Sequence, residues 1–350
     1  MTLDIALILG IDGLAISAVY LLAGLGLVLI FSVTRVVFVP FGDIAAISAL
    51  TLATLQIGRL PGTVWLVLIL ALIATLMELV QLWRAGEFVK APAAVLGYGL
   101  CPAIPAAVAV LADGFKLPML PQMLLTLALV APIAPLIDRI AFRPLADASV
   151  LVLLMVAVAV HFALSGLSLM FFGPEGFRTE PISRALFDFG GVTVSAQVLI
   201  MIGAAALFSG LLYLFFDRTI NGKALRATAI NRVGARIVGI RPARTSTIAY
   251  ILASLLGGIS GLLIGPVATL YYDSGFLIGL KAFVGAIIGG LASYPLTALG
   301  AIFVGILESY ASFWSSTLKE SIVFAALIPI LLWRSFTSRA HESEEEEDIE

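Results

Sequence analysis

Charged residues are scarce in this 350-residue sequence, where they make up 12% of the chain against 61% hydrophobic residues. Water-soluble domains carry about 25% charged residues. A soluble fold of this length would therefore lack most of the charge that its surface needs. Lipid is the solvent that fits such a composition. The shortage of charge excludes a soluble enzyme and predicts an integral membrane protein.

Cysteine and catalytic motifs are equally sparse. The single cysteine, Cys101, excludes an internal disulfide and a CxxC metal site, and its apolar neighbours predict a buried, inert thiol. No GxxxxGK[ST] loop occurs, since the one Gly-Lys pair, Gly222-Lys223, is followed by alanine. HExxH, GxSxG and Cys/His clusters are missing too. We expect no catalysis, no ATP hydrolysis, no metal and no cofactor in this chain.

Long hydrophobic runs, by contrast, fill the sequence, and about 20 apolar residues suffice for a helix to cross the hydrocarbon layer. Seven runs have that length: 13–33, 63–83, 92–112, 121–141, 149–171, 193–216 and 245–265. Shorter runs, which half-helices or re-entrant pieces would explain, are 43–57, 276–291, 295–312 and a last one ending at Trp333. The expected fold is an all-α polytopic bundle of about 9–11 transmembrane or half-membrane helices within residues 1–340.

The positive charges predict the orientation. With the amino terminus outside, the inside loops hold fourteen of the twenty Lys and Arg residues, so N-out, C-in is favoured. Residues 342–350 hold seven acids. Such a like-charge run predicts a solvated, disordered tail over 341–350, with a docking role as the alternative.

The most basic segment, 217–244, separates two hydrophobic runs. From Lys223 to Ile237 it alternates small or apolar residues with arginines, as a short amphipathic surface helix would, and two glycines bracket it. We predict a cytoplasmic element that docks to a partner; the alternative is a loop that only fixes topology. The candidate docking residues are Gly222, Lys223, Arg226, Arg232, Arg236 and Gly239.

A proline-glycine break lies at Val39-Pro40-Phe41-Gly42-Asp43. Asp43 is a natural N-cap for the short helical run that follows. A helix that begins inside the membrane points its positive end at whatever occupies the cavity. Phe41, Gly42 and Asp43 are therefore candidate substrate-pathway residues, and the capping and pathway roles of Asp43 both stay open.

Four ionisable residues lie within predicted spans, where charge is costly and must face protein or water. Glu78 is expected to snorkel or to pair with Arg84. His161 is expected to form an interhelical hydrogen bond, with a proton relay as the alternative. Lys281 and Glu308 are candidates for lining a polar substrate route, and a structural ion pair between helices is the alternative.

Glycines recur every four residues from Gly257 to Gly265 and from Gly285 to Gly289. This spacing gathers small residues on one helix face, so that two helix backbones can approach closely. We therefore expect the region 245–312 to form the tightly packed centre of the bundle.

Several stretches are distinctive when taken together. They are the run from Gly13 to Phe31 with the later Gly42-Asp43, RIAFRPL at 139–145, GKALRATAINRVGARIVGI at 222–240, GLKAFVGAIIGGLAS at 279–293 and GAIFVGILES at 300–309. Over residues 13–58 and 121–334 they resemble branched-chain amino-acid ABC importer permeases of the LivH type. Residues 62–120 look like a two-helix insertion. The Asn-Phe-Ala-His-like stretch typical of that family is replaced here by Phe38-Val39-Pro40-Phe41.

The resemblance implies a non-catalytic permease subunit of an ATP-driven importer in the bacterial inner membrane. Its partners would be a second LivM-like permease or a second copy, two P-loop ATPase subunits that bind ATP and Mg, and a periplasmic or extracellular solute-binding protein. It would be embedded in membrane lipid and would bind no nucleic acid. Aliphatic amino acids are the expected solute, and urea, short amides or other small polar solutes are the alternative. A self-sufficient secondary transporter or channel and a non-transporting scaffold subunit are the competing classes.

Overall fold

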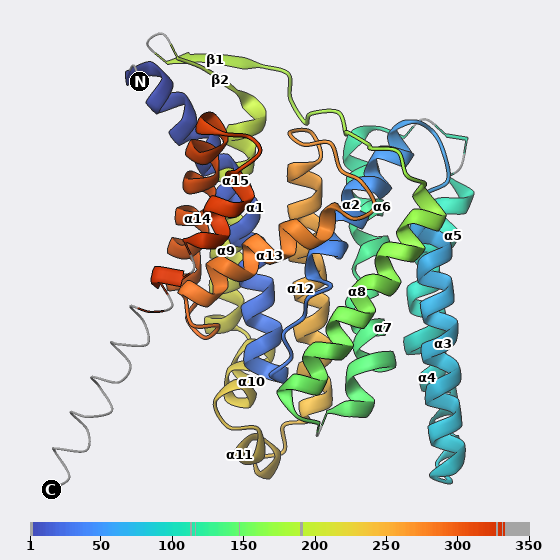
Figure 1. Cartoon of the computed structure of the whole chain (residues 1–350). Helices are drawn as coiled ribbons and strands as arrows, with labels where there is room; N and C mark the ends of the chain where they lie inside the picture. Colours follow the sequence, from blue (N-terminus) through green and yellow to red (C-terminus); the bar gives the residue numbers. More distant parts are fainter. Residues whose placement is uncertain are drawn as a thin grey trace, which may run out of the picture.

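The structure, a computed structural model, describes residues 3–112, 114–115, 117–146, 148–189, 192–326, 328–330 and 332. It is a bundle of roughly aligned helices with a β-hairpin at one end and two short helices at the other (Figure 1). We call the end with β1 (Leu186–Phe189) and β2 (Val192–Ser195) the hairpin face. The end with α10 (Ile220–Ile230) and α11 (Arg232–Ile237) is the basic face. The predicted acidic tail and Trp333 lie outside the described residues.

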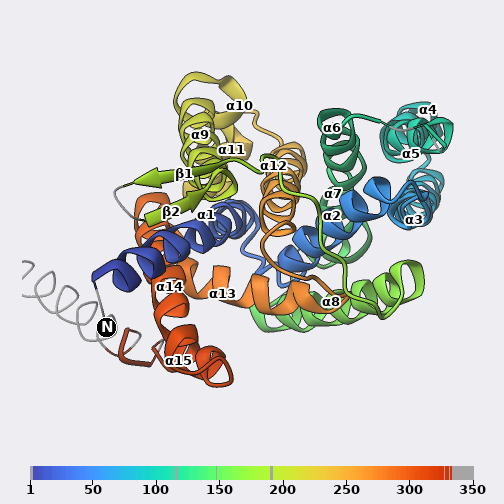
Figure 2. The same cartoon turned by 90° about the horizontal axis from the view of Figure 1, so that it is seen from above.

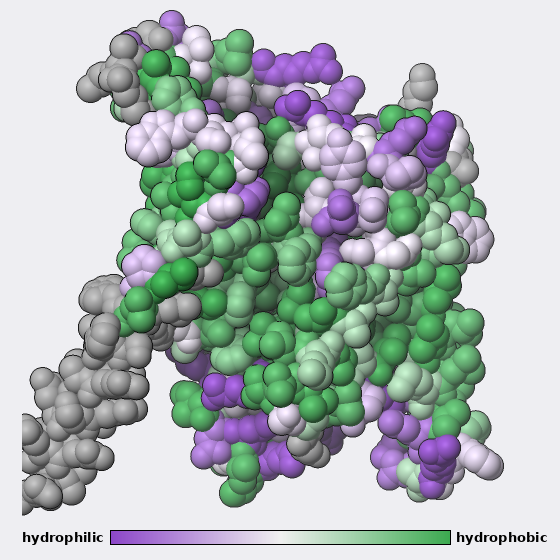
Figure 3. Space-filling view, viewed as in Figure 1, coloured by the Kyte–Doolittle hydropathy of each residue, from purple (hydrophilic) through white to green (hydrophobic). Residues whose placement is uncertain are grey.

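Within the described residues, eight helical stretches are long and apolar enough to cross a membrane. They are Asp4–Thr34, Thr63–Arg84, Phe88–Leu111, Met119–Leu145, Val150–Phe172, Ala196–Arg218, Pro242–Ile264 and Tyr294–Trp314. Figure 3 shows the matching surface, a broad apolar band between polar ends. The predicted all-α polytopic membrane bundle is confirmed, and the hairpin β1–β2 is its small exception.

The elements follow one another with few long loops. The long helices are α1 (Leu3–Thr34), α3 (Thr63–Arg84), α8 (Val150–Phe172), α9 (Ala196–Arg218), α12 (Pro242–Ile264) and α14 (Tyr294–Trp314). The shorter pieces are α2 (Phe41–Gln56), α4 (Ala91–Ala94), α5 (Cys101–Leu111), α6 (Met119–Val130), α7 (Ile133–Ile137), α13 (Ser274–Ile288) and α15 (Lys319–Ala325). Two 3₁₀-helical turns, η1 (Phe88–Lys90) and η4 (Arg143–Leu145), and two π-helical turns, η2 (Val95–Leu100) and η3 (Asp138–Phe142), complete the described helices.

The centre of the bundle is built around α1, which packs against α12, α13 and α14 (Figure 2). Glycines make these contacts close. A Cβ on Gly285 would lie 3.0 Å from the backbone nitrogen of Ala301 on α14, and one on Gly261 would overlap the carbonyl of Ala45 on α2. The predicted tight packing in the region 245–312 is confirmed, because helix backbones meet where a side chain would not fit.

The chain turns back into the bundle after α1. Arg35 adopts a positive φ of 61°, and the following turn is buried, with Phe38 fully inaccessible. Proline disfavours helix at the residue before it and lacks an N–H, so Pro40 keeps Val39 out of the helix and lets α2 begin only at Phe41. The helix α2 then runs to the hairpin face, where Gln56 accepts a hydrogen bond from the Glu180 backbone at 2.8 Å.

A strap of chain, residues 173–185, crosses the hairpin face between α8 and β1. Phe177 forms an antiparallel backbone bridge with Leu270, and the Thr179 N–H donates to the Gly265 carbonyl at 3.1 Å. We call this segment the outer strap. It covers the end of α2 and the turn that precedes α13.

Residues 62–120 form a helix pair at one edge of the molecule, made of α3 and the continuous run α4–η2–α5 (Figure 2). Pro102 and Pro105 lack the N–H groups that an α-helix needs, so the run widens into the π-turn η2 just before them. Cys101 is exposed here, and the prediction of a buried thiol is wrong. Leu100 and Ile104 beside it are also exposed, which matches a lipid environment instead of a protein core.

Candidate functional site

The helix break places Asp43 in the first turn of α2, deep inside the protein. Pro40 occupies the N-cap position and no side chain caps this helix, so the prediction that Asp43 is the N-cap is wrong. The carboxylate is engaged elsewhere. Asp43 Oδ2 lies 2.8 Å from Nδ1 of His161 on α8, and its Oδ1 lies 3.0 Å from the same nitrogen.

This pair joins α2 to α8 inside the bundle. Asp43 is 3% exposed and His161 is 5% exposed, so water does not screen their interaction. The His161 ring also rests on Phe276 of α13, with 5.0 Å between ring centroids. The interhelical hydrogen bond predicted for His161 is confirmed. A polar contact of this kind inside a membrane marks a functional site until another role is shown.

The amino-terminal ends of α2 and α13 meet at the same place. A Cβ on Gly42 would overlap the backbone of Gly275 and Gly279, and a Cβ on Gly275 would lie 2.6 Å from Asp43 Oδ1. Two half-length helices therefore direct their positive dipole ends at one buried carboxylate. Glycine is required on both helices because the backbones touch.

An apolar cavity of about 230 Å³ adjoins this meeting point. Its walls come from α1, the turn before α2, α8 and α13, and they include Phe38, Val39, Val158, Phe276 and Gly279. Phe276 is shared with the His161 contact, and Gly279 with the Gly42 contact. We call Asp43, His161, this cavity and the two helix ends the helix-break site.

Lys281 and Glu308 occupy a different environment. Lys281 Nζ lies 2.6 Å from Glu308 Oε1 and 3.0 Å from Glu320 Oε1, and the Tyr20 hydroxyl donates to Glu308 Oε2 at 2.6 Å. This cluster ties α1, α13, α14 and α15 together. Phe41, Gly42 and Asp43 are thus gathered at the helix-break site, whereas Lys281 and Glu308 form the interhelical ion pair that was the alternative. Their place on a solute route stays a prediction.

The basic segment folds as two helices, and the expectation of one helix bracketed by glycines is wrong. Thr219 caps α10 by accepting from the Gly222 N–H at 2.9 Å, and Asn231 caps α11 by accepting from the Gly234 N–H at 2.8 Å. Asn231 has extended backbone angles, which interrupt the helix. Gly222 lies within α10 against Phe215, and Gly239 ends α11 with a φ of 86°.

The outer side of these two helices is apolar as well as basic. Lys223, Arg226 and Arg236 are exposed, and Arg226 lies over the Phe216 ring at 5.9 Å. Large apolar side chains beside them are at least two-thirds exposed: Ile220, Ile230, Val233, Ile237 and Val238. We call this set the docking patch. Exposed apolar groups rimmed by charge are typical of protein or membrane interaction surfaces.

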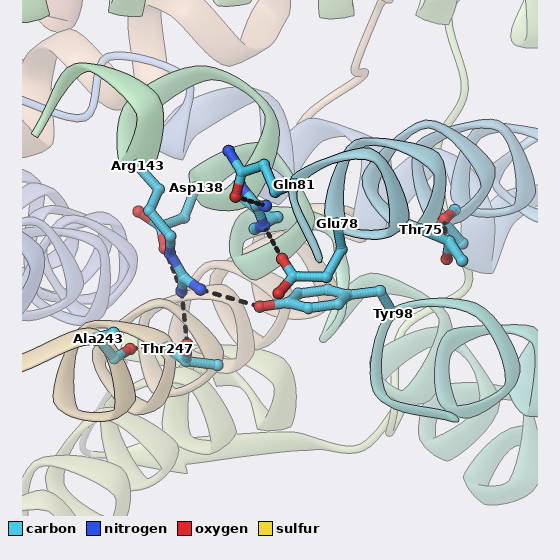
Figure 4. Close-up of polar contacts among 10 residues, drawn as sticks. Thr75, Glu78, Gln81, Tyr98, Asp138, Arg143, Ala243 and Thr247 are labelled. Carbon is cyan, nitrogen blue, oxygen red and sulfur yellow. Dashed lines mark hydrogen bonds and ion pairs between the residues drawn. The ribbon is translucent and has the colours of Figure 1, made fainter. Parts of the chain in front are cut away.

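Two arginines hold the 62–120 helix pair to the bundle near the basic face (Figure 4). Arg139, which is 2% exposed, donates to Glu78 Oε2 and, at 2.6 Å, to Gln81 Oε1. Arg143 donates to the Tyr98 hydroxyl at 2.9 Å. The prediction that Glu78 snorkels or pairs with Arg84 is wrong, because Glu78 accepts from the buried guanidinium of Arg139 instead.

The Arg143 side chain also reaches the body of the protein. Its Nη2 lies 3.0 Å from Asp138 Oδ2 and 2.9 Å from Thr247 Oγ1 on α12. Sequence reasoning missed this cluster, which we call the arginine latch. The signal was present in the RIAFRPL stretch, whose two arginines sit one helical turn apart at the end of an apolar run.

A bundle of membrane-spanning helices, interrupted by two half-helices at a buried polar site, has the architecture of a membrane transport permease. The chain belongs to the family of permease components of the branched-chain amino acid transport system, whose model matches residues 92–332. The match starts inside the segment predicted to be an insertion and leaves residues 13–58 outside. The insertion therefore stays a prediction.

Individual relatives agree with the family. The BraD permease of Pseudomonas aeruginosa is 28% identical over 206 residues, which cover 57% of this chain and 67% of BraD. The LivH permease of Salmonella typhimurium is 27% identical over 205 residues, 56% of this chain and 66% of LivH. A probable LivH permease of Methanocaldococcus jannaschii is 28% identical over 222 residues, 59% of this chain and 68% of its own length. The aligned part thus spans about two thirds of each relative. No solved structure matches.

Proposed function

We propose that this chain is the transmembrane permease subunit of an ATP-driven importer for branched-chain or other aliphatic amino acids. Family membership supports the class of protein. The observation that carries the proposal is the helix-break site, where the buried Asp43–His161 hydrogen bond and two helix ends adjoin an apolar cavity of about 230 Å³.

The helix-break site suits a zwitterion with an aliphatic side chain. The amino-terminal ends of α2 and α13 favour a carboxylate near the cavity. The walls of the cavity are almost entirely apolar and favour a branched hydrocarbon side chain. Urea and short amides, the alternative solutes, would leave those walls without a partner.

Energy would come from other subunits. We propose that two P-loop ATPase subunits, which bind ATP and Mg, dock on the docking patch, so that the basic face is cytoplasmic in the bacterial inner membrane. A second permease, either a LivM-like chain or another copy, completes the channel. A solute-binding protein delivers the solute to the hairpin face. This corresponds to the N-out, C-in orientation that the loop charges predict.

The test of this function is uptake by proteoliposomes that contain this chain in complex with its partner subunits. The partners are the ATPase, permease and solute-binding protein encoded by neighbouring genes. We expect ATP-dependent accumulation of labelled leucine that exceeds accumulation of urea. Replacing Ile230 and Ile237 with aspartate should abolish ATPase association, because each is at least 80% exposed and contributes to no core. Ile57→Asp, at an exposed position on the hairpin face, is the matched control. Leucine uptake without the ATPase would instead indicate a secondary transporter.

The route itself can be tested at the cavity wall. Val158→Phe places a ring in the cavity, whereas Val152→Phe makes the same change elsewhere on α8. We expect leucine uptake to fall about tenfold in the first variant and alanine uptake to change less, since a pocket discriminates by about 1–3 kcal/mol per methylene. Equal losses for both amino acids would show that the cavity does not hold the side chain.

A further inference from the structure

A second cavity, of about 210 Å³, lies at the basic face between α11, the beginning of α12 and the turn η3–η4. We call it the arginine cavity, because three guanidinium groups and one carboxylate line it among the described residues. Its polar lining consists of Thr34, Asp138, Arg143, Arg232, Arg236 and Ser246. A concave site with such a surplus of positive charge attracts anions.

Two of the three arginines have no acidic partner in the part of the chain that the structure describes. Arg143 has one, since its Nη2 lies 3.0 Å from Asp138 Oδ2 in the arginine latch (Figure 4). Arg232 and Arg236 form no ion pair with any described residue. The Nε of Arg232 is buried and has no hydrogen-bond partner there. A buried donor without an acceptor is costly, so this group favours an anionic ligand.

One layer of aromatic side chains separates the arginine cavity from the cavity of the helix-break site. The turn after α1 lines both, with Val36 at the arginine cavity and Phe38 at the helix-break cavity. The Phe38 ring packs edge-on against Phe142, which lines the arginine cavity, with 5.7 Å between ring centroids. Tyr250 of α12 packs against both rings. We call these three buried rings the aromatic layer, and such dense packing leaves no passage for a solute.

We propose that the arginine cavity is the cytoplasmic exit site of the solute route, where Arg232 and Arg236 receive the carboxylate of an amino acid when the aromatic layer opens. This inference rests on the proposed function and extends its route from the helix-break site to the basic face. Arginine forks bind carboxylates in bidentate geometry. Asp138 is already engaged by Arg143, so the site recognises the carboxylate of the solute and not its ammonium group.

The two arginines suit a site from which a solute is released. Arg236 is exposed, so water screens its charge and a carboxylate is held only weakly. Both arginines belong to α11, which also carries Val233 and Ile237 of the docking patch. An ATPase subunit docked on that patch contacts the helix that supplies the exit site. A displacement of α11 therefore changes the docking surface and the arginine cavity together.

The first test asks whether a carboxylate enters the arginine cavity of the full chain alone, in nanodiscs of phosphatidylcholine. In a Cys101→Ala background, Ala146→Cys places a thiol in the cavity lining, and Ile220→Cys is the control, on α10 outside the cavity. The rate of labelling by N-ethylmaleimide, which is uncharged, is measured as leucine is titrated. One third of the sites stay free at twice the dissociation constant, so labelling at 146 should slow about threefold there. Leucinamide, which has no carboxylate, should not protect, and Arg232→Gln with Arg236→Gln should remove the protection by leucine.

The second test asks whether the aromatic layer is the barrier between the two cavities. In proteoliposomes that contain the assembled complex and no ATP, Phe142→Ala should raise passive leucine efflux about tenfold, because a small lowering of a barrier gives a large change in rate. Phe313→Ala removes a half-exposed ring of α14 and is the control. Phe142→Leu keeps most of the volume and should leak far less. The labelling experiment leaves the aromatic layer intact, so its result does not depend on the folding of these variants.

Several outcomes would overturn the proposal. Equal protection of position 146 by leucinamide, or by inorganic phosphate at the same concentration, would show that the cavity does not select the carboxylate of the solute. Slower labelling without leucine in nanodiscs of equimolar phosphatidylcholine and phosphatidylglycerol would assign the cavity to a lipid headgroup. Efflux at the control level from a monodisperse Phe142→Ala complex would place the barrier elsewhere. Missing protection alongside ATP-dependent leucine uptake would overturn the exit site alone, whereas missing uptake would reject the proposed function.

Discussion

The centre of the bundle and the 62–120 helix pair are joined to the rest of the protein by opposite means. At the centre, helix backbones pack directly against each other because glycines have no side chains, as where Gly42 touches Gly275 and Gly279. At the edge, the pair is held by long polar side chains, as where Arg139 reaches Glu78 and Arg143 reaches Tyr98. Both solutions answer one problem, which is that apolar surfaces gain little by packing together in lipid.

The difference also separates the central helices, whose spacing must stay fixed, from the 62–120 helix pair, which is attached at the edge. Backbone contact tolerates no change in spacing, because packed interiors leave no room for an extra methyl group. A guanidinium on a flexible stem can find an acid or a hydroxyl on a neighbouring helix over several ångströms. The helix-break site lies in the glycine-packed part, and the 62–120 pair is attached through the arginine latch.

The largest effect is expected where backbones touch. Gly42→Val should prevent folding, because its Cβ would overlap the Gly275 backbone and neither half-helix can move away. We expect no monodisperse protein in size-exclusion chromatography after extraction. Gly97→Ala is the control, since its Cβ would meet nothing within 4 Å. If Gly42→Val were folded and active, the half-helices would not be in backbone contact.

An intermediate effect is expected at the arginine latch. Glu78→Gln removes the partner charge of Arg139, which is 2% exposed, and an uncompensated buried charge costs about 3–5 kcal/mol. The thermal midpoint should fall clearly, with the 62–120 pair becoming sensitive to proteolysis first. Glu87→Gln breaks an ion pair whose two members are exposed. It should change stability by less than about 1 kcal/mol. Equal effects of the two changes would contradict the latch.

The smallest effect is expected from Tyr98→Phe, which deletes one hydrogen bond to Arg143 and keeps the ring. One hydrogen bond to a charged group is worth about 1.5–3 kcal/mol at most, and Arg143 retains Asp138 and Thr247. We therefore expect a loss near 1 kcal/mol in reversible unfolding, against none for the exposed Tyr213→Phe. A loss as large as that of Glu78→Gln would mean that Tyr98 anchors the pair by itself.

Much of the fold could be predicted from the sequence because lipid imposes a simple rule on helix length and composition. Hydropathy located the spans and the short helices, and glycine spacing located the dense centre. The Pro40-Phe41-Gly42 break indicated a half-helix, although α13 was recognised only as another short run. That the two half-helices begin at one point depends on their crossing, and a single sequence carries no information about helix crossings.

The polar partners were harder to predict for a physical reason. Glu78 and Arg139 are far apart in the chain, and nothing local distinguishes Arg139 from the nearer Arg84. Burial decided the pairing, because a guanidinium inside the protein needs an acid more than one at the surface does. The prediction of a buried Cys101 failed for a related reason, since the sequence of its apolar neighbours is the same whether they face a protein core or lipid.

The outer strap makes the two half-helices parts of one mechanical linkage. It is hydrogen-bonded to the far end of α2 through Gln56 and to the chain leading into α13 through Gly265 and Leu270. The near ends of the same helices touch at Gly42 and Gly275. The two half-helices are therefore connected to each other at both of their ends. We therefore expect that a displacement of the strap on the hairpin face changes the spacing around Asp43 through α2 and the turn before α13.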